Sequence, residues 1–309
     1  MSGFSHFMAY GGWAVFSVIA AVFSAGFYLV NQYLKQPGHA LVFWSRVLTV
    51  VAMTPFMTQV DFPAAPGFYG IVALTVVFGI GADIRTFNST ALFGGGVVSR
   101  LMPATVWGAF FLWLVLHPSL LLTYAGHPWN TAGILLALGG CVWFAMRLNK
   151  CEVTRNAAIH MLPAVAGYTI TTVLNKMAMQ HGDAETSFAG VVYAYMYVQS
   201  CLAVLVLGPY VVFREKRRAD KGAQLWRHDT MLAAALLAML VWVCHMIYKN
   251  YAMAYTPNPS YQGAVNLTAP VFVAIFYYFA GHKEKADVMS GMGIVACAIL
   301  LALLTLQPQ

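Results

Sequence analysis

The sequence predicts an all-α integral membrane protein with ten transmembrane helices, arranged as two inverted five-helix repeats. Three observations predict this fold: the scarcity of charge, a series of long apolar runs, and a weak internal repeat. Of the 309 residues, 60% are hydrophobic and only 9% are charged, whereas soluble domains carry about 25% charged residues. This composition favours lipid over water as the solvent of the chain.

The apolar runs have the length of a helix that crosses a bilayer, roughly 20 residues. Their residues do not alternate with the two-residue period of barrel strands, so helices are favoured. The predicted spans are residues 12–34, 39–58, 68–90, 97–117, 129–148, 157–180, 188–213, 229–255, 259–280 and 286–306. The first is predicted to be a retained span and not a cleaved signal peptide, because it lacks a basic leader and a small-residue cleavage site.

The basic residues predict how the chain is oriented. Twelve of the 17 Lys and Arg lie in alternate connections: Lys35, Arg147, Lys150, Arg155, six within 214–227, Lys283 and Lys285. The other connections and both termini have none. By the positive-inside rule, the 214–227 loop is predicted to be cytoplasmic and both termini outside. We therefore expect a multi-pass protein of the cytoplasmic (inner) membrane, and the net charge of +7 needs no nucleic-acid partner.

An internal repeat divides the chain into residues 1–150 and 151–309, two halves of one membrane domain. LVNQYLKQ (29–36) resembles VLNKMAMQ (173–180), and STALFGGGVVSRLMPATVW (89–107) resembles residues 250–274. The alignment pairs Asn31 with Asn175, Asn88 with Lys249, and Pro103 with Pro270. Each half holds five spans, an odd number, so equivalent halves cross the membrane in opposite directions. Inverted repeats are a recurrent plan of secondary transporters, whose substrate site lies at the midplane.

Polar and aromatic side chains recur at helical spacing on several spans, which predicts a central cavity for a small molecule. Prolines 103 and 270 are predicted to kink their spans beside it. The candidate substrate-binding residues are Tyr28, Asn31, Arg46, Asp83, Arg85, Asn88, Arg100, Tyr168, Asn175, Lys176, Tyr193, Tyr197, Trp242, His245, Lys249, Gln262 and Asn266. For any single stripe, helix packing is the competing role.

Among the charged candidates, a single acid, Asp83, accompanies five bases within the spans. A charge in the membrane is expected to face a partner or a watery cavity. Asp83 is predicted to pair with Arg46 or Arg100, either as a structural salt bridge or as the acid that couples a proton to transport. The other bases lie near span ends, where snorkelling to the surface competes. The excess of bases predicts an anionic or zwitterionic substrate.

Other functions fit parts of the same pattern. A phosphorylated, nucleotide-sugar or lipid-linked substrate, exchanged or flipped across the membrane, also suits the surplus of bases. A receptor or assembly subunit without transport is the alternative from another class. Enzymatic activity is not expected, because the chain has no HExxH motif, no nucleotide-binding loop and no second buried acid. The five cysteines form no CxxC pair, and we expect neither a metal nor a cofactor.

A family resemblance adds to these expectations. GAVNLTAPVFVAIFYYFAGHKEKADVMSGMGIVACAILLALL (263–304) resembles the end of proteins of the drug/metabolite transporter superfamily, EamA-like family. Its carriers are Thr268-Ala269-Pro270, the Gly281 turn, and the pair Gly291 and Gly293. The resemblance implies a ten-span metabolite exporter of two inverted repeats. Three features depart from the family. Gly281-His282 replaces its usual Gly-Glu pair, and the connection between spans 2 and 3, often basic in the family, is DFPAAPG. The usual cytoplasmic termini of the family are opposite to the orientation that the charges predict.

Overall fold

The computed structural model describes residues 7, 11–148, 153–181, 187–219, 228–279 and 287–305, which form helices joined by short turns. The helices are α2 (Trp13–Leu34), α3 (Gly38–Met57), α4 (Pro66–Phe93), α5 (Gly95–Leu101), α6 (Ala104–Leu116), α7 (Ser119–Gly126), α8 (Pro128–Leu148), α9 (Arg155–Gln180), α10 (Phe188–Ala219), α11 (His228–Tyr255), α12 (Pro259–Asn266), α13 (Ala269–Phe279) and α14 (Val288–Thr305). Within these residues, ten segments are long and apolar enough to cross a membrane. The ten predicted spans are confirmed, with ends that differ by only a few residues.

Two of the ten spans are interrupted. The fourth consists of α5 and α6, which are separated at Met102-Pro103, and the ninth consists of α12 and α13, separated at Leu267-Thr268. Pro103 lies in the first interruption, and Pro270 is the second residue of α13, directly after the other. A proline ring removes a backbone donor and collides with the preceding helical turn. The predicted kinks at Pro103 and Pro270 are therefore confirmed as interruptions at or just before each proline.

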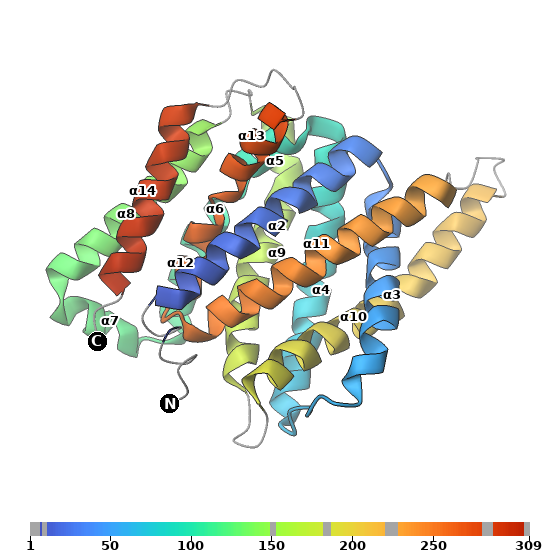
Figure 1. The fold of residues 1–309 in the computed structure, drawn as a ribbon, viewed down its shortest axis with the longest axis horizontal. Helices are drawn as coiled ribbons and strands as arrows, with labels where there is room; N and C mark the ends of the chain where they lie inside the picture. Colours follow the sequence, from blue (N-terminus) through green and yellow to red (C-terminus); the bar gives the residue numbers. More distant parts are fainter. Residues whose placement is uncertain are drawn as a thin grey trace.

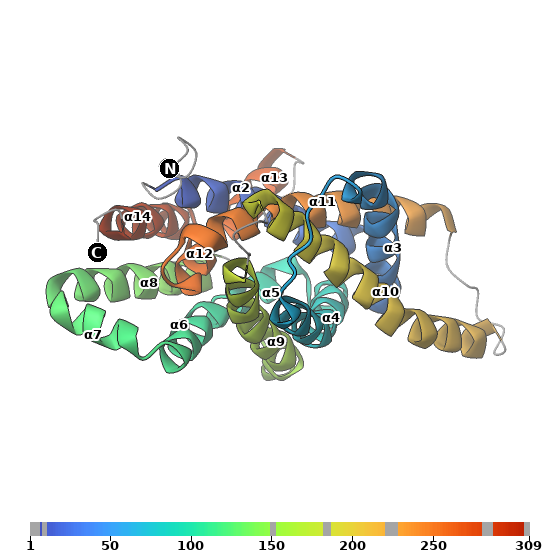
Figure 2. The same cartoon turned by 90° about the horizontal axis from the view of Figure 1, so that it is seen from below.

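The helices pack in pairs that join distant parts of the chain. In Figure 1, α8 and α14 lie side by side at one edge, and α3 and α10 lie at the other. Between these edges α2 packs along α11, and α9 packs along α4. Figure 2 gives the same order from below. The α4–α9 contact is close at Gly167, where an added Cβ would lie only 3.0 Å from both Ala82 Cβ and the Phe78 carbonyl oxygen. Small residues of this kind let membrane helices approach each other.

The outer surface of the bundle is apolar. Trp129 is 89% exposed, Phe279 81% and Leu122 78%. Large apolar side chains exposed over a whole surface match a lipid environment, whereas a soluble monomer exposes only limited apolar patches. The connection before α8 contains the short helix α7, which the sequence pattern did not predict. Its eight residues are too few to cross a bilayer.

Candidate functional site

A cavity of about 150 Å³ lies inside the bundle, lined by residues of α2, α4, α5, α6, α9, α11, α12 and α13. Ser24, Tyr168 and Trp242 line it near the middle of their helices. At 1.5 Å per residue, each lies about 15 to 21 Å from either end of its helix. The cavity is therefore central along the helices, as a midplane site requires.

Seven of the seventeen predicted site residues line this cavity. They are Asp83, Tyr168, Trp242, His245, Lys249, Gln262 and Asn266. The seventeen residues do not include Ser24, Phe27, Ser99, Thr105, Thr172 and Met246, which also line it. Thr172 follows Tyr168 by one helical turn, and Ser99 and Thr105 flank the Pro103 interruption, so helical spacing and the proline were usable signals. Phe27 and Met246 carry no sequence signal that separates them from core residues.

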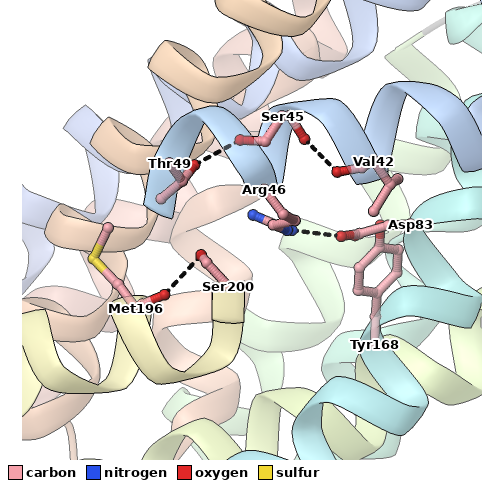
Figure 3. Close-up of polar contacts among 8 residues, drawn as sticks. All are labelled: Val42, Ser45, Arg46, Thr49, Asp83, Tyr168, Met196 and Ser200. Atoms are coloured by element: carbon pink, nitrogen blue, oxygen red, sulfur yellow. Dashed lines mark hydrogen bonds and ion pairs between the residues drawn. The ribbon is translucent and has the colours of Figure 1, made fainter. Parts of the chain in front are cut away.

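Asp83 pairs with Arg46 in the part of the bundle next to the cavity (Figure 3). Arg46 Nη2 lies 2.8 Å from Asp83 Oδ2, and the Tyr168 hydroxyl donates to Asp83 Oδ1 at 2.8 Å. The Arg46 guanidinium also lies 3.5 Å from the centre of the Trp242 ring, a cation–π contact. Of the two predicted partners of Asp83, the structure selects Arg46. The network joins α3, α4, α9 and α11.

The hydroxyl groups near Arg46 are directed to their own helices. Ser45 donates to the Val42 carbonyl, Thr49 to the Ser45 carbonyl and Ser200 to the Met196 carbonyl, each at 2.8 Å (Figure 3). Arg46 Nη1 is buried and has no hydrogen-bond partner among the described residues. Asp83 is therefore the group that compensates the charge of this 4% exposed arginine.

The two lysines within the spans, buried Lys176 and half-buried Lys249, differ in their surroundings. Lys176 Nζ donates to the carbonyl oxygens of Met253 at 2.8 Å and Ala254 at 3.0 Å. These carbonyls belong to the last turn of α11, where main-chain acceptors lack intrahelical partners. Lys249 instead lines the cavity, and within the described parts of the chain its ammonium has neither a salt bridge nor a hydrogen bond. Lys249 is the cation that the cavity leaves open.

Three other polar groups belong to the same wall. His245 Nδ1 lies 2.9 Å from the Ala20 carbonyl oxygen, and because a carbonyl only accepts, Nδ1 carries the proton and Nε2 is left as an acceptor. Gln262 Nε2 and Asn266 Oδ1 are buried and have no hydrogen-bond partner among the described residues. These residues therefore add two amide side chains and an imidazole to the wall that Lys249 lines.

Two of the predicted site residues hold a turn instead of lining the cavity. Asn31 Nδ2 donates to the carbonyls of Phe87 at 2.9 Å and Gln36 at 3.0 Å, and Asn31 Oδ1 accepts from the Gln36 amide at 2.8 Å. Asn88 Oδ1 accepts from the Gly38 amide at 3.0 Å. These bonds fasten the turn between α2 and α3 to α4.

The remaining candidates lie away from the cavity lining. Asn175 accepts a hydrogen bond from the Tyr195 hydroxyl, and the Tyr197 hydroxyl lies 3.2 Å from the Thr54 hydroxyl. Tyr193 packs in an apolar cluster with α11. Exposed Arg85 lies 3.4 Å from His160, and Arg100 Nε donates to the Met146 carbonyl at 2.7 Å. The Tyr28 side chain lies outside the part of the chain that the structure describes. Thus α10, predicted to contribute two tyrosines, supplies none of the described lining.

Comparisons with known proteins give no assignment: no family model matches the chain, and no curated protein is significantly similar to it. Across the described residues, no three or more His, Cys, Asp or Glu side chains gather into a group that could hold a metal ion. The function is therefore argued from the cavity and the helix arrangement themselves.

Proposed function

We propose that the protein is a secondary transporter that moves a small organic anionic or zwitterionic metabolite across the membrane by alternating access. The observation that carries this proposal is the central cavity, which is lined from both halves of the chain. Its wall combines the open ammonium of Lys249 with unpartnered amide atoms of Gln262 and Asn266. A concave site with few, specifically placed polar groups is typical of small-molecule binding.

The helix arrangement supports an inverted repeat of residues 1–150 and 151–309. Numbering the spans in chain order, span 1 packs on span 8 (α2 on α11), and span 6 packs on span 3 (α9 on α4). Spans 1 and 6 occupy equivalent places in the two halves, as do spans 3 and 8, so the two pairs are the same contact made once in each direction. Spans 5 and 10 (α8 and α14) pair with each other, as do spans 2 and 7 (α3 and α10).

The interrupted spans support alternating access. Spans 4 and 9 are five places apart, and residues at both interruptions, Met102 and Leu267, line the cavity. Broken helices at a midplane site are a feature of transporters built from inverted repeats, in which one bundle rocks against the other. The Thr268-Ala269-Pro270 interruption also carries the resemblance to the EamA-like family of the drug/metabolite transporter superfamily, and we propose membership of that family.

The cavity volume favours a small substrate over a nucleotide sugar. Pockets for drug-sized ligands span about 300 to 1,000 Å³, so a cavity of about 150 Å³ holds a smaller molecule. A nucleotide sugar or lipid-linked sugar exceeds the drug-sized range itself. The excess of bases suits both classes of substrate, whereas the cavity volume favours the small metabolite.

The Arg46–Asp83 pair supports a structural salt bridge over a proton-coupling site. Protonating Asp83 would leave the Arg46 guanidinium buried without a counter-charge, which is costly in a low-dielectric interior. We therefore expect the Asp83→Asn variant, where it folds, to respond to an imposed pH gradient as the wild type does. Loss of pH-gradient coupling with retained exchange would assign the coupling role to Asp83.

The positive-inside asymmetry supports a cytoplasmic 214–227 loop and outside termini. The described basic residues Arg147 and Arg155 lie at the α8–α9 connection. This connection is on the same side of the membrane as the end of α10, because two spans, α9 and α10, lie between them. Green fluorescent protein does not become fluorescent when it is exported by the Sec route, so we expect a fusion at the C-terminus to remain dark. A fluorescent fusion would establish cytoplasmic termini and contradict this orientation.

Transport is tested with purified protein in sealed liposomes loaded with lactate, alanine and 1-amino-2-propanol at equal concentrations. Release of at least one solute faster than from protein-free liposomes is the expected result. Binding of a solute without release from any liposome preparation would overturn transport and favour the receptor or assembly alternative.

A further inference from the structure

We propose that the cavity selects a small carboxylate monoanion over zwitterions and cations of the same size, with Lys249 as its anion-binding residue. This inference rests on the proposed function and narrows its substrate class. It follows from which charges of the cavity are already compensated and which are open.

The cavity wall carries one carboxylate, and that carboxylate is engaged. Asp83 Oδ2 accepts a hydrogen bond from Arg46 Nη2 at 2.8 Å, and Asp83 Oδ1 accepts one from the Tyr168 hydroxyl at 2.8 Å. The guanidinium neutralises the charge of Asp83, and the hydroxyl occupies its other oxygen. A substrate ammonium would therefore meet no free counter-charge on the described wall.

The cavity also carries one open cation. Lys249 lies six residues before the end of α11, so its Cα is about 9 Å from that end of the helix. Its ammonium lies at the cavity with no described carboxylate within salt-bridge distance. Charged side chains at membrane depth face partners or watery cavities. Asp83 attracts this ammonium only from beyond salt-bridge distance, and a carboxylate bound in the cavity would supply a direct partner.

The neighbours of Lys249 suit the rest of a small carboxylate. Gln262 and Asn266 line the cavity, and their Nε2 and Oδ1 atoms are buried without a described partner, while His245 Nε2 is an acceptor for a substrate hydroxyl. Phe27 lines the same cavity and offers apolar contact. A short hydroxy acid offers a carboxylate to Lys249 and a hydroxyl to His245.

The same arrangement disfavours a zwitterion. In a cavity of about 150 Å³, an amino acid whose carboxylate pairs with Lys249 keeps its own ammonium close to that lysine. Like charges repel strongly where water is scarce, and Asp83 is already neutralised. Replacing the ammonium by a hydroxyl removes the repulsion and gains a donor for the open acceptors.

The test compares four probes of equal size and different charge: lactate, alanine, 1-amino-2-propanol and lactamide. Binding to the detergent-purified protein is measured by ligand-dependent thermal shift and by calorimetry. We expect lactate to bind about tenfold to a hundredfold more tightly than each of the others, the effect of one charge-assisted contact. Tighter binding of alanine or of 1-amino-2-propanol would overturn the proposal.

Substitutions at position 249 identify the responsible residue. Lys249→Arg keeps the charge and is expected to retain the preference for lactate, whereas Lys249→Gln is expected to lose it. Lys249→Glu is expected to bind 1-amino-2-propanol in preference to lactate. An unchanged preference for lactate in folded Lys249→Gln would overturn the role of Lys249.

Failure of this inference and failure of transport give different results. Release of alanine from loaded liposomes, with lactate neither bound nor released, contradicts anion selection and leaves transport standing. Lactate binding that depends on Lys249, with no release of lactate from liposomes, supports anion selection and contradicts transport.

Discussion

Two lysines lie within the membrane-spanning bundle, Lys176 buried and Lys249 half-buried, and their surroundings are opposite. Lys176 on α9 is 3% exposed and donates to two carbonyls at the end of α11. Lys249 on α11 opens onto the central cavity and has no hydrogen bond or ion pair within the described residues. Both lysines place a cation in an apolar span, yet only Lys176 is directly bonded to groups of the protein.

The difference separates architecture from binding. A buried polar group that is fully bonded stabilises the position of its helix, whereas a buried group left open loses its hydration without compensation. Lys176 belongs to the first kind, and the charges of Arg46 and Asp83 compensate each other although Arg46 Nη1 has no described partner. Gln262 Nε2 and Asn266 Oδ1 belong to the second, and the half-buried Lys249 lines the same cavity as these two residues.

Removing the compensation of a buried charge is expected to have the largest effect. Asp83→Ala leaves Arg46 buried without a counter-ion and should reduce the free energy of unfolding by about 3 to 5 kcal/mol. Unfolding of the purified protein by SDS titration measures this change. The double variant Arg46→Met with Asp83→Ala should recover most of the loss. Equal losses in the single and double variants would contradict the compensating role of Asp83.

A smaller loss is expected at Lys176. Lys176→Met removes the Lys176 hydrogen bonds to the Met253 and Ala254 carbonyls, although Met253 keeps the Thr256 hydroxyl as a donor. The loss should reduce the free energy of unfolding by about 1 to 3 kcal/mol. The same SDS titration applies, with Lys249→Met as the matched control on the other lysine within the spans. A Lys176→Met protein as stable as wild type would remove the contrast between the two lysines.

The Lys249→Met control should shift stability in the opposite direction. Replacing a half-buried cation that has no direct partner by an apolar side chain of similar length should raise the free energy of unfolding by about 1 kcal/mol. In the absence of a bound anion, this change gives up only the longer-range attraction of Asp83. A loss of 1 kcal/mol or more would show that Lys249 has a structural partner, and the cavity would then have no open cation.

The smallest effect is expected at Asn266. Asn266→Ala removes a carbonyl oxygen that has no described partner, so its effect on unfolding should stay within about 0.5 kcal/mol. Asn31→Ala is the paired variant, because it removes three hydrogen bonds at the α2–α3 turn. Similar losses for the two asparagines would show that bonding in the structure does not distinguish them.

The sequence predicted the spans because hydropathy depends on local composition. Ten runs and two proline interruptions are readable without tertiary information, as is the expectation that Asp83 pairs with Arg46 or Arg100. The choice between these arginines depends on packing: Arg46 reaches Asp83, while Arg100 bonds a carbonyl of α8. Helix crossing geometry has no local signal in the sequence.

The same limit applies to the site. Lys176 and Lys249 look alike in sequence, each a lone cation in an apolar span near a helix end. Asn31 and Asn175 were expected at the cavity for their polarity, but both bond to groups of neighbouring helices. Which polar residue is bonded and which stays open depends on the neighbours that packing supplies.

The central claim is that one cavity opens in turn to both sides of the membrane. A single cysteine at position 24, Ser24→Cys, placed in a variant whose five native cysteines are replaced by serine or alanine, tests it in right-side-out and inside-out vesicles. Labelling by a membrane-impermeant thiol reagent should occur from both sides and should slow when lactate is present. Labelling from one side only, or from neither, would contradict alternating access.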